Sequence, residues 1–164
     1  MDDNIRQYGE REWVKDKKYS DQVKDQVGNP GFSLVNVVTG QALRHAPAVR
    51  EPVQMVPYNR DVLDINFMWS ESHDLGDGHR AIRMANNILL NLDIFHGDSN
   101  VHDASTLVLW EWNEGANQRW RIVPYFRSSI SRYSSQQQQP PQAWIIICRI
   151  TFRPLPTAIT VRQR

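Results

Sequence analysis

Short stretches rich in β-branched and aromatic residues run along the whole chain, and helical periodicity is scarce. Turn-forming sequences such as Thr39-Gly40-Gln41 and Asp77-Gly78 separate these stretches. Many short strands with turns between them favour an all-β barrel or sandwich. The pattern predicts strands at residues 32–37, 41–45, 53–57, 67–70, 81–84, 89–92, 107–111 and 120–124.

Two segments fit a helical turn better than a strand. Residues 60–65 precede an aromatic strand and are predicted to form a short helix, and residues 13–17 are predicted to form one helical turn. Neither segment is long enough to be a stable helix by itself.

Three tryptophans indicate an internal repeat. Three segments end alike, in Glu12-Trp13-Val14, Met68-Trp69-Ser70 and Arg119-Trp120-Arg121. Their tryptophans recur at roughly 50-residue spacing, which fits a repeat of four strands per unit. By this count the chain holds two full units and the closing end of another.

The stretch from Leu107 to Tyr125 combines a strand carrying Trp110 and Trp112 with the polar segment Asn117-Gln118-Arg119-Trp120. Strand alternation sends Leu107 and Leu109 inward, and Val108 and Trp110 outward. An outward aromatic face beside amide groups, which both donate and accept hydrogen bonds, suits a ligand with an apolar face and several hydroxyls. This pattern predicts a sugar site.

Composition and charge narrow the possible functions. Nineteen basic and eighteen acidic residues give a net charge of +1, which provides no strong field for nucleic acid or an anionic membrane. The one cysteine, Cys148, allows no internal disulfide and favours a reducing compartment. The N-terminal residues carry no apolar signal-peptide core, and the most apolar run, residues 143–147, is too short to span a bilayer.

The composition changes near residue 127. Residues 128–141 are a polar, serine- and glutamine-rich segment that ends in Pro140-Pro141. Residues 143–164 have strand propensity but no counterpart in the repeat. We therefore expect a domain at 1–126, followed by a linker and an unrelated tail at 127–164. A linker of this composition does not hold the tail in a defined register against the strands of the domain.

Several ordered motifs resemble the Euonymus-type lectin domain of plants, a branch of the ricin B-like lectins. The resemblance covers about two thirds of the chain, from Glu12 to Pro124. The motifs that carry it are Phe32-Ser33-Leu34-Val35-Asn36, Thr39-Gly40-Gln41-Ala42, Val56-Pro57-Tyr58-Asn59, Trp69-Ser70-Glu71-Ser72, Ile82-Arg83-Met84, Phe95-His96-Gly97, Val101-His102-Asp103, Leu109-Trp110-Glu111-Trp112 and Asn117-Gln118-Arg119-Trp120.

The resemblance implies an all-β fold, the β-trefoil, and carbohydrate binding without catalysis or a cofactor, in plant cytoplasm and nucleus during abiotic stress. Two departures matter. The opening strands of the family's first unit have no match here, and nothing after Phe126 resembles the family. We therefore expect a first repeat truncated at its N-terminus, with an open strand edge in the barrel.

The resemblance also implies that Trp120 fills the centre of the barrel, and it assigns a site. A ricin B-like unit uses a carboxylate that accepts from sugar hydroxyls, an aromatic platform, an Asn, and a Gln that braces the loop. In the third unit these are Asp93, Trp110, Asn117 and Gln118, with Asp103 as a second candidate carboxylate. The second unit has Val56 at the platform position and no Asn-Gln pair before Trp69, so one site is expected.

Other functions have less support in the sequence. The five histidines match no metal-ligand spacing, although His96 and His102 lie near Asp98 and Asp103, and no nucleophile or phosphate-loop motif is present. A protein-interaction module and a non-functional truncated fragment stay open as alternatives. Mannose- and galactose-containing glycans both fit the resemblance, and neither the preferred sugar nor the oligomeric state follows from the sequence.

Overall fold

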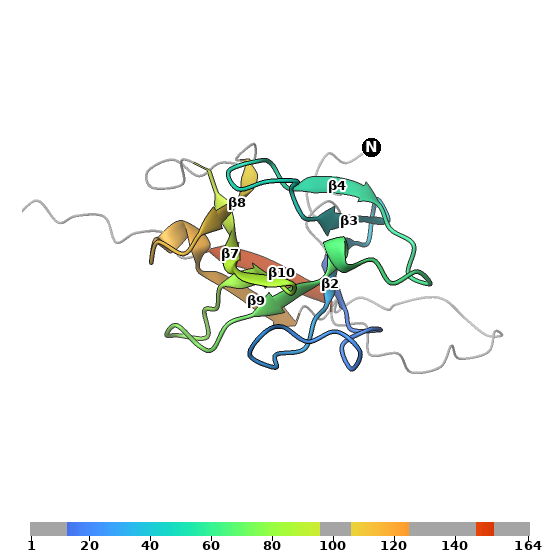
Figure 1. Cartoon of the computed structure of the whole chain (residues 1–164), viewed down its shortest axis with the longest axis horizontal. Helices are drawn as coiled ribbons and strands as arrows, with labels where there is room; N and C mark the ends of the chain where they lie inside the picture. Colours follow the sequence, from blue (N-terminus) through green and yellow to red (C-terminus); the bar gives the residue numbers. More distant parts are fainter. Residues whose placement is uncertain (1–12, 96–105, 125–146, 153–164) are drawn as a thin grey trace, which may run out of the picture.

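The computed structural model describes residues 13–95, 106–124 and 147–152 of the chain (Figure 1). These residues form strands joined by turns and two short 3-10 helices, η1 (Ile65–Phe67) and η2 (Ala116–Gln118). The strands are β1 (Trp13–Asp16), β2 (Ser33–Asn36), β3 (Gln41–Arg44), β4 (Gln54–Pro57), β5 (Trp69–Glu71), β6 (Ile82–Met84), β7 (Asn87–Ile94), β8 (Leu107–Glu111), β9 (Trp120–Pro124) and β10 (Ile147–Phe152). No helix among the described residues is long and apolar enough to cross a membrane.

The eight predicted strands are confirmed as β2 to β9, with ends that differ by a few residues. The two helix predictions are wrong. The segment predicted as a helical turn at 13–17 is strand β1, because backbone pairing with β2 on one side and β10 on the other stabilises the extended form. The helix predicted at 60–65 is displaced to η1, where the Asp64 side chain accepts a hydrogen bond from the Asn66 backbone N–H.

Six strands close into a barrel. Three antiparallel pairs, β1–β2, β5–β6 and β9–β10, are joined by bridges between Phe32 and Trp69 and between Arg80 and Trp120, and β10 pairs with β1 to complete the ring. The hairpins β3–β4 and β7–β8 lie at one end, drawn at the top of Figure 1, and the β1–β2 and β5–β6 connections lie at the other. This arrangement of repeated four-strand units is the predicted β-trefoil.

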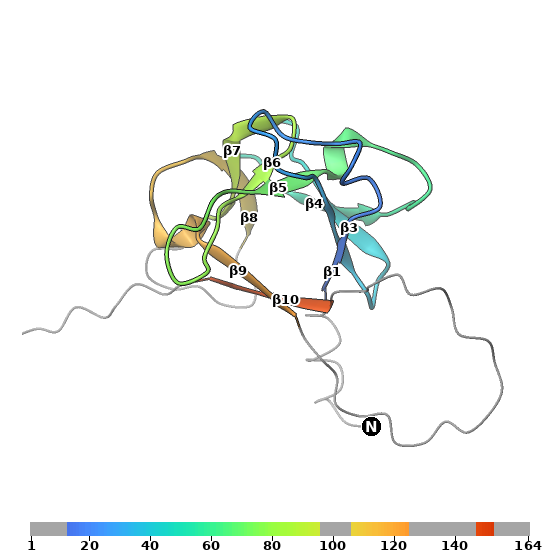
Figure 2. The same cartoon turned by 90° about the horizontal axis from the view of Figure 1, so that it is seen from below.

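Strand β10 corrects the prediction of an open strand edge. It lies between β9 and β1, with Phe152 opposite Trp120 and Cys148 opposite Trp13 (Figure 2). Unpaired N–H and C=O groups on two strand edges favour the addition of any segment with strand propensity. The sequence does not reveal this pairing, because the segment has no counterpart in the repeat. Residues 125–146 lie outside the described residues, so the domain boundary at 126 stays a prediction.

The core confirms the role predicted for Trp120, and Trp69 has an equivalent position. Trp69 is fully buried and Trp120 nearly so, and the indole N–H groups donate to matching backbone carbonyls, Leu43 at 2.9 Å and Leu92 at 2.8 Å. Trp13 packs against the same cluster of buried residues. These equivalent bonds relate the second unit, which contains β2 to β5, to the third, which contains β6 to β9.

Candidate functional site

The hairpin β7–β8 presents one face to the core and the other to the predicted site. Leu92 pairs with Leu109, and both side chains are fully buried in the core, as predicted for Leu109. Asn91 pairs with Trp110 and Asp93 with Val108, so these four side chains share the opposite face. Asp93 and Trp110 are therefore on the same face of one hairpin.

One residue of this face departs from the prediction. Val108 was expected to be exposed, but it is buried because a segment from the second unit runs along β8. Pro52 forms a bridge with Val108, and the Val53 backbone N–H donates to the Leu107 carbonyl. This contact between units decides the burial, and strand alternation alone does not anticipate it.

Helix η2 brings two amides onto the Asp93 carboxylate. The Asn117 side-chain amide donates to Asp93 Oδ1 at 2.9 Å, and the Gln118 side-chain amide donates to Asp93 Oδ2 at 2.7 Å. Asp93 is 3% exposed and Gln118 is fully buried. The structure thus joins three of the predicted site residues in one hydrogen-bonded group, whose buried charge is stabilised by directed donors.

Gln118 also fixes the loop that follows β8. Its Nε2 donates to the Glu111 carbonyl at 2.8 Å, and its Oε1 accepts from the Asn113 backbone N–H at 3.0 Å. Both polar atoms of this buried side chain therefore form hydrogen bonds, to Asp93 and to the backbone of the loop. This geometry matches the bracing role that the family resemblance implies for Gln118.

Asn117 lies against the backbone of Gly115. A Cβ atom on Gly115 would come within 2.2 Å of Asn117 Oδ1, which is closer than any tolerated contact. The same oxygen is buried and has no hydrogen-bond partner among the described residues. The sequence marked Gly115 only as a turn residue, whereas the structure shows that any side chain there would displace the Asn117 amide.

Trp110 is half-buried and has two close neighbours. The Arg50 guanidinium lies 4.6 Å from the centre of the indole, and the Phe95 ring centroid lies 6.3 Å away. Arg50 comes from the connection between β3 and β4 and has a positive φ of 68°; its backbone N–H donates to the Leu109 carbonyl at 2.7 Å. Sequence reasoning missed Arg50, because no local pattern shows that this connection reaches the third unit.

The remaining predicted residues contribute less to this geometry. Trp112 is 38% exposed at the rim beyond the end of β8. Asp103, the second candidate carboxylate, lies outside the described residues, as do His96 and His102. The described part of the chain contains no group of three or more His, Cys, Asp or Glu side chains arranged to hold a metal ion.

The second unit lacks most of this constellation at equivalent positions. Its register pairs Ala42 with Val56 where the third unit pairs Asn91 with Trp110, so Val56 takes the platform position, as predicted. By the same register, Arg44 takes the position of Asp93. Counting back from the core tryptophans, Phe67 takes the position of Gln118, although Asn66 takes that of Asn117. The second unit therefore keeps one amide and loses the carboxylate.

Comparisons with known proteins agree with the sequence resemblance. No protein-family model matches the chain. It is 51% identical over 117 residues to "Ricin B-like lectin R40G3" of Oryza sativa subsp. japonica, covering 70% of this chain and 57% of that protein. It is 51% identical over 116 residues to "Ricin B-like lectin EULS3" of Arabidopsis thaliana, covering 69% of this chain and 37% of that protein.

The chain thus spans between about one third and three fifths of the length of these curated relatives. Among solved structures, a designed 3-fold symmetric protein, ThreeFoil, superposes with a TM-score of 0.49 and 24% sequence identity, covering 63% of this chain and 70% of that one. Over about seven tenths of its length, the chain is a homologue of the ricin B-like lectins.

Proposed function

We propose that this chain is a carbohydrate-binding lectin of the ricin B-like family, Euonymus type, with one site in its third unit. The observation that carries the proposal is the hydrogen-bonded group of Asp93, Asn117 and Gln118 beside Trp110. The homologous proteins named as lectins supply independent support. The ligands are glycans that contain mannose or galactose, free or on glycoproteins.

Each side chain has a chemical role in this proposal. The indole of Trp110 supplies a flat apolar surface for the face of a sugar ring, at a small cost in conformational entropy. Asp93 is the charged acceptor, and charge-assisted hydrogen bonds from sugar hydroxyls to a carboxylate are strong and directional. Asn117 and Gln118 donate to the Asp93 carboxylate and hold it in place, and Gln118 also holds the loop. The buried Asn117 Oδ1 becomes a further acceptor for the sugar when the side chain moves.

Arg50 adds a requirement that the sequence does not suggest. Its guanidinium lies over the Trp110 ring, so a sugar that stacks on this face replaces a cation–π contact. Such a contact contributes about 0.5–1 kcal/mol at exposed sites. Ligand binding therefore includes movement of the Arg50 side chain away from Trp110, which lowers the net affinity.

The rest of the proposal follows from the family resemblance. We propose binding without catalysis and without a cofactor, in the cytoplasm and nucleus, in a role connected with abiotic stress. Because the chain spans only part of its relatives, these properties are proposed for the domain rather than taken over from the longer proteins.

A glycan array with matched variants tests the site. Trp110→Ala and Asp93→Ala should each abolish detectable binding to mannose- and galactose-containing glycans, since weak sugar binding depends on every contact. Val56→Ala, at the platform position of the second unit, is the control and should leave binding unchanged. Far-ultraviolet circular dichroism checks that each variant is folded. Binding that survives in both site variants would contradict the site assignment.

A further inference from the structure

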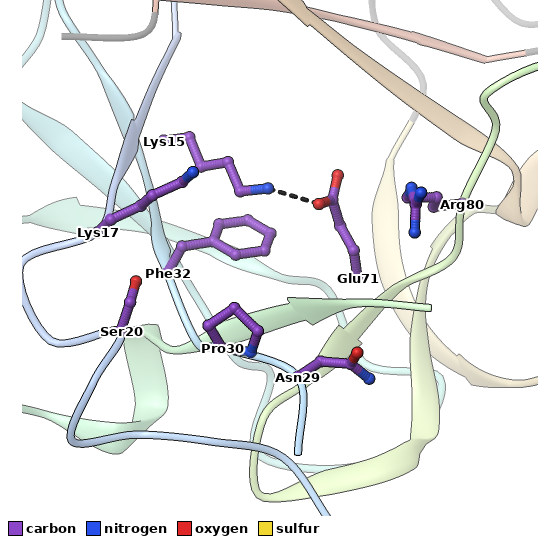
Figure 3. A pocket seen from close by; sticks show the side chains of 8 residues that line it. All are labelled: Lys15, Lys17, Ser20, Asn29, Pro30, Phe32, Glu71 and Arg80. Atoms are coloured by element: carbon purple, nitrogen blue, oxygen red, sulfur yellow. Dashed lines mark hydrogen bonds and ion pairs between the residues drawn. The ribbon is translucent and has the colours of Figure 1, made fainter. Parts of the chain in front are cut away.

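A hollow lies away from the candidate sugar site, against strand β1 and the residues just before β2. It has a volume of about 260 Å³. The side chains that line it come from β1, the β1–β2 connection, β5 and the residues before β6; they are Lys15, Lys17, Ser20, Asn29, Pro30, Phe32, Glu71 and Arg80 (Figure 3).

Comparison of the three core tryptophans locates this hollow at the barrel mouth. The residues two positions after Trp13, Trp69 and Trp120 lie on the same strand faces as those tryptophans. They are Lys15, Glu71 and Ile122, and Ile122 packs against the core. The fold therefore accepts an aliphatic side chain at this position in the third unit. The equivalent positions in the first and second units carry the charged residues Lys15 and Glu71.

The charged pair is not explained by stability. Lys15 Nζ lies 2.5 Å from the Glu71 carboxylate, and the two side chains are only 14% and 24% exposed. Removing both charges from water has a large cost, and apolar residues of similar volume are often neutral or more stabilising at such sites. A charged pair that lines a cavity is therefore a candidate for ligand binding.

The net charge of the lining is positive. Lys15 neutralises Glu71 and also lies 4.2 Å from the centre of the Phe32 ring. Arg80 lies on the other side of Glu71 in Figure 3; its Nη1 donates to the Ser72 carbonyl at 2.7 Å. Lys17 is exposed and has no acidic partner within ion-pair distance in the described part of the chain. Two cationic groups, Arg80 and Lys17, thus have no carboxylate of their own in this lining.

We propose that this cavity binds a phosphate group, either as free phosphate or as the phosphate of a small monoester. Guanidinium and ammonium donors converging on a pocket are the groups that recognise phosphate oxygens. A neutral sugar fits less well, because the one carboxylate is held by Lys15 and the Phe32 ring is 2% exposed. Pro30, which is exposed, leaves an apolar surface for the carbon body of an ester.

Isothermal titration calorimetry of the full chain with inorganic phosphate, at fixed low ionic strength, tests the proposal. We expect saturable binding that Lys17→Gln weakens about tenfold, the loss of one charged hydrogen-bond donor. Lys24→Gln removes the same charge from an exposed residue that does not line the cavity and should leave the affinity unchanged. Absence of saturable binding, or equal effects of the two substitutions, would overturn the proposal.

A second variant tests the role of the ion pair. Glu71→Gln frees Lys15 for the ligand and removes a repelling carboxylate, so phosphate should bind several-fold more tightly; weaker binding by a folded variant would contradict this geometry.

Parallel titrations with glycerol 3-phosphate and with phosphatidylcholine vesicles containing a phosphoinositide distinguish a soluble ester from a lipid headgroup. Trp110→Ala should bind phosphate normally, which separates this site from the proposed sugar site.

Discussion

The second and third units have the same backbone plan but place different chemistry on it. In both units a tryptophan indole donates to a backbone carbonyl of the hairpin β3–β4 or β7–β8, and a 3-10 helix precedes that tryptophan. Around this common frame, Asp93 and Gln118 in the third unit correspond to Arg44 and Phe67 in the second. The comparison shows that the packing of the fold requires the same core residues in both units. The residues around the 3-10 helix are not needed for that packing, so they can differ and form a binding site.

The two units also differ in what stabilises the 3-10 helix. In the second unit the Asp64 side chain accepts from the Asn66 backbone N–H and from its side-chain amide, so the loop is self-contained. In the third unit Gly115 replaces the capping aspartate, and the Asn117 amide is turned onto Asp93. The third unit therefore gives up a local cap and gains a group that links the helix to strand β7.

The largest expected effect comes from converting the third unit toward the second with Gln118→Phe. This substitution removes one charge-assisted donor from the buried Asp93 carboxylate and two hydrogen bonds from the loop, so the free energy of unfolding should fall by about 4 kcal/mol. Urea denaturation measures the change. The reciprocal control, Phe67→Gln in the second unit, should not create glycan binding, because Arg44 stands where a carboxylate is needed.

Acid should affect the second unit through His45, which lies where the third unit has Ile94. Burial lowers the pKa of His45 from 6.5 to about 4; the Met68 carbonyl and Asp64 act in the opposite direction, and Arg44 acts in the same direction as burial. Because the pKa is depressed in the folded state, the contribution of neutral His45 to stability is complete above pH 6.5 and is lost as the pH falls toward 4. The loss should reach roughly 3 kcal/mol.

His45→Ile isolates this effect by giving the second unit the residue of the third. The Met68 carbonyl keeps a hydrogen bond from the Ala85 N–H in this variant. Urea midpoints measured between pH 7 and pH 4 should therefore fall less in the variant than in the original chain. If both proteins lose stability equally over this range, His45 does not titrate as described.

Gly115→Ala should damage the third unit alone. The added methyl group would overlap Asn117 Oδ1, so the amide must move and its bond to Asp93 must weaken. We expect a loss of about 1–3 kcal/mol of stability, within the usual range for overpacking, together with weaker glycan binding. Thermal denaturation and a glycan titration measure the two effects. Gly40→Ala serves as a comparison, because an added Cβ there meets no atom and strains only the positive φ of 68°.

Arg50→Ala should produce the smallest effect, and in the opposite direction. Removing the guanidinium exposes the face of Trp110, so glycan affinity should rise two- to fivefold, which is the equivalent of a surface cation–π contact of about 0.5–1 kcal/mol. Surface plasmon resonance on immobilised glycans resolves this range. A fall in affinity would instead assign Arg50 a direct contact with the ligand.

The sequence by itself determined the strands and the repeat. Turn residues and β-branched runs act over a few neighbours, so they located β2 to β9, and the recurring tryptophans identified the core. The family resemblance, and not a local pattern, grouped Asn117 and Gln118 with Asp93, and the structure brings the three side chains together.

The tertiary structure alone decided which distant segments lie together. Strand β1 is extended because β2 and β10 flank it, Val108 is buried because the connection containing Pro52 covers it, and Arg50 reaches Trp110 from another unit. The Lys15–Glu71 pair at the barrel mouth likewise joins residues far apart in the chain. These contacts form only when segments that are far apart in the chain pack against one another. Their free energy therefore depends on the whole fold, and no local pattern of residues encodes these contacts.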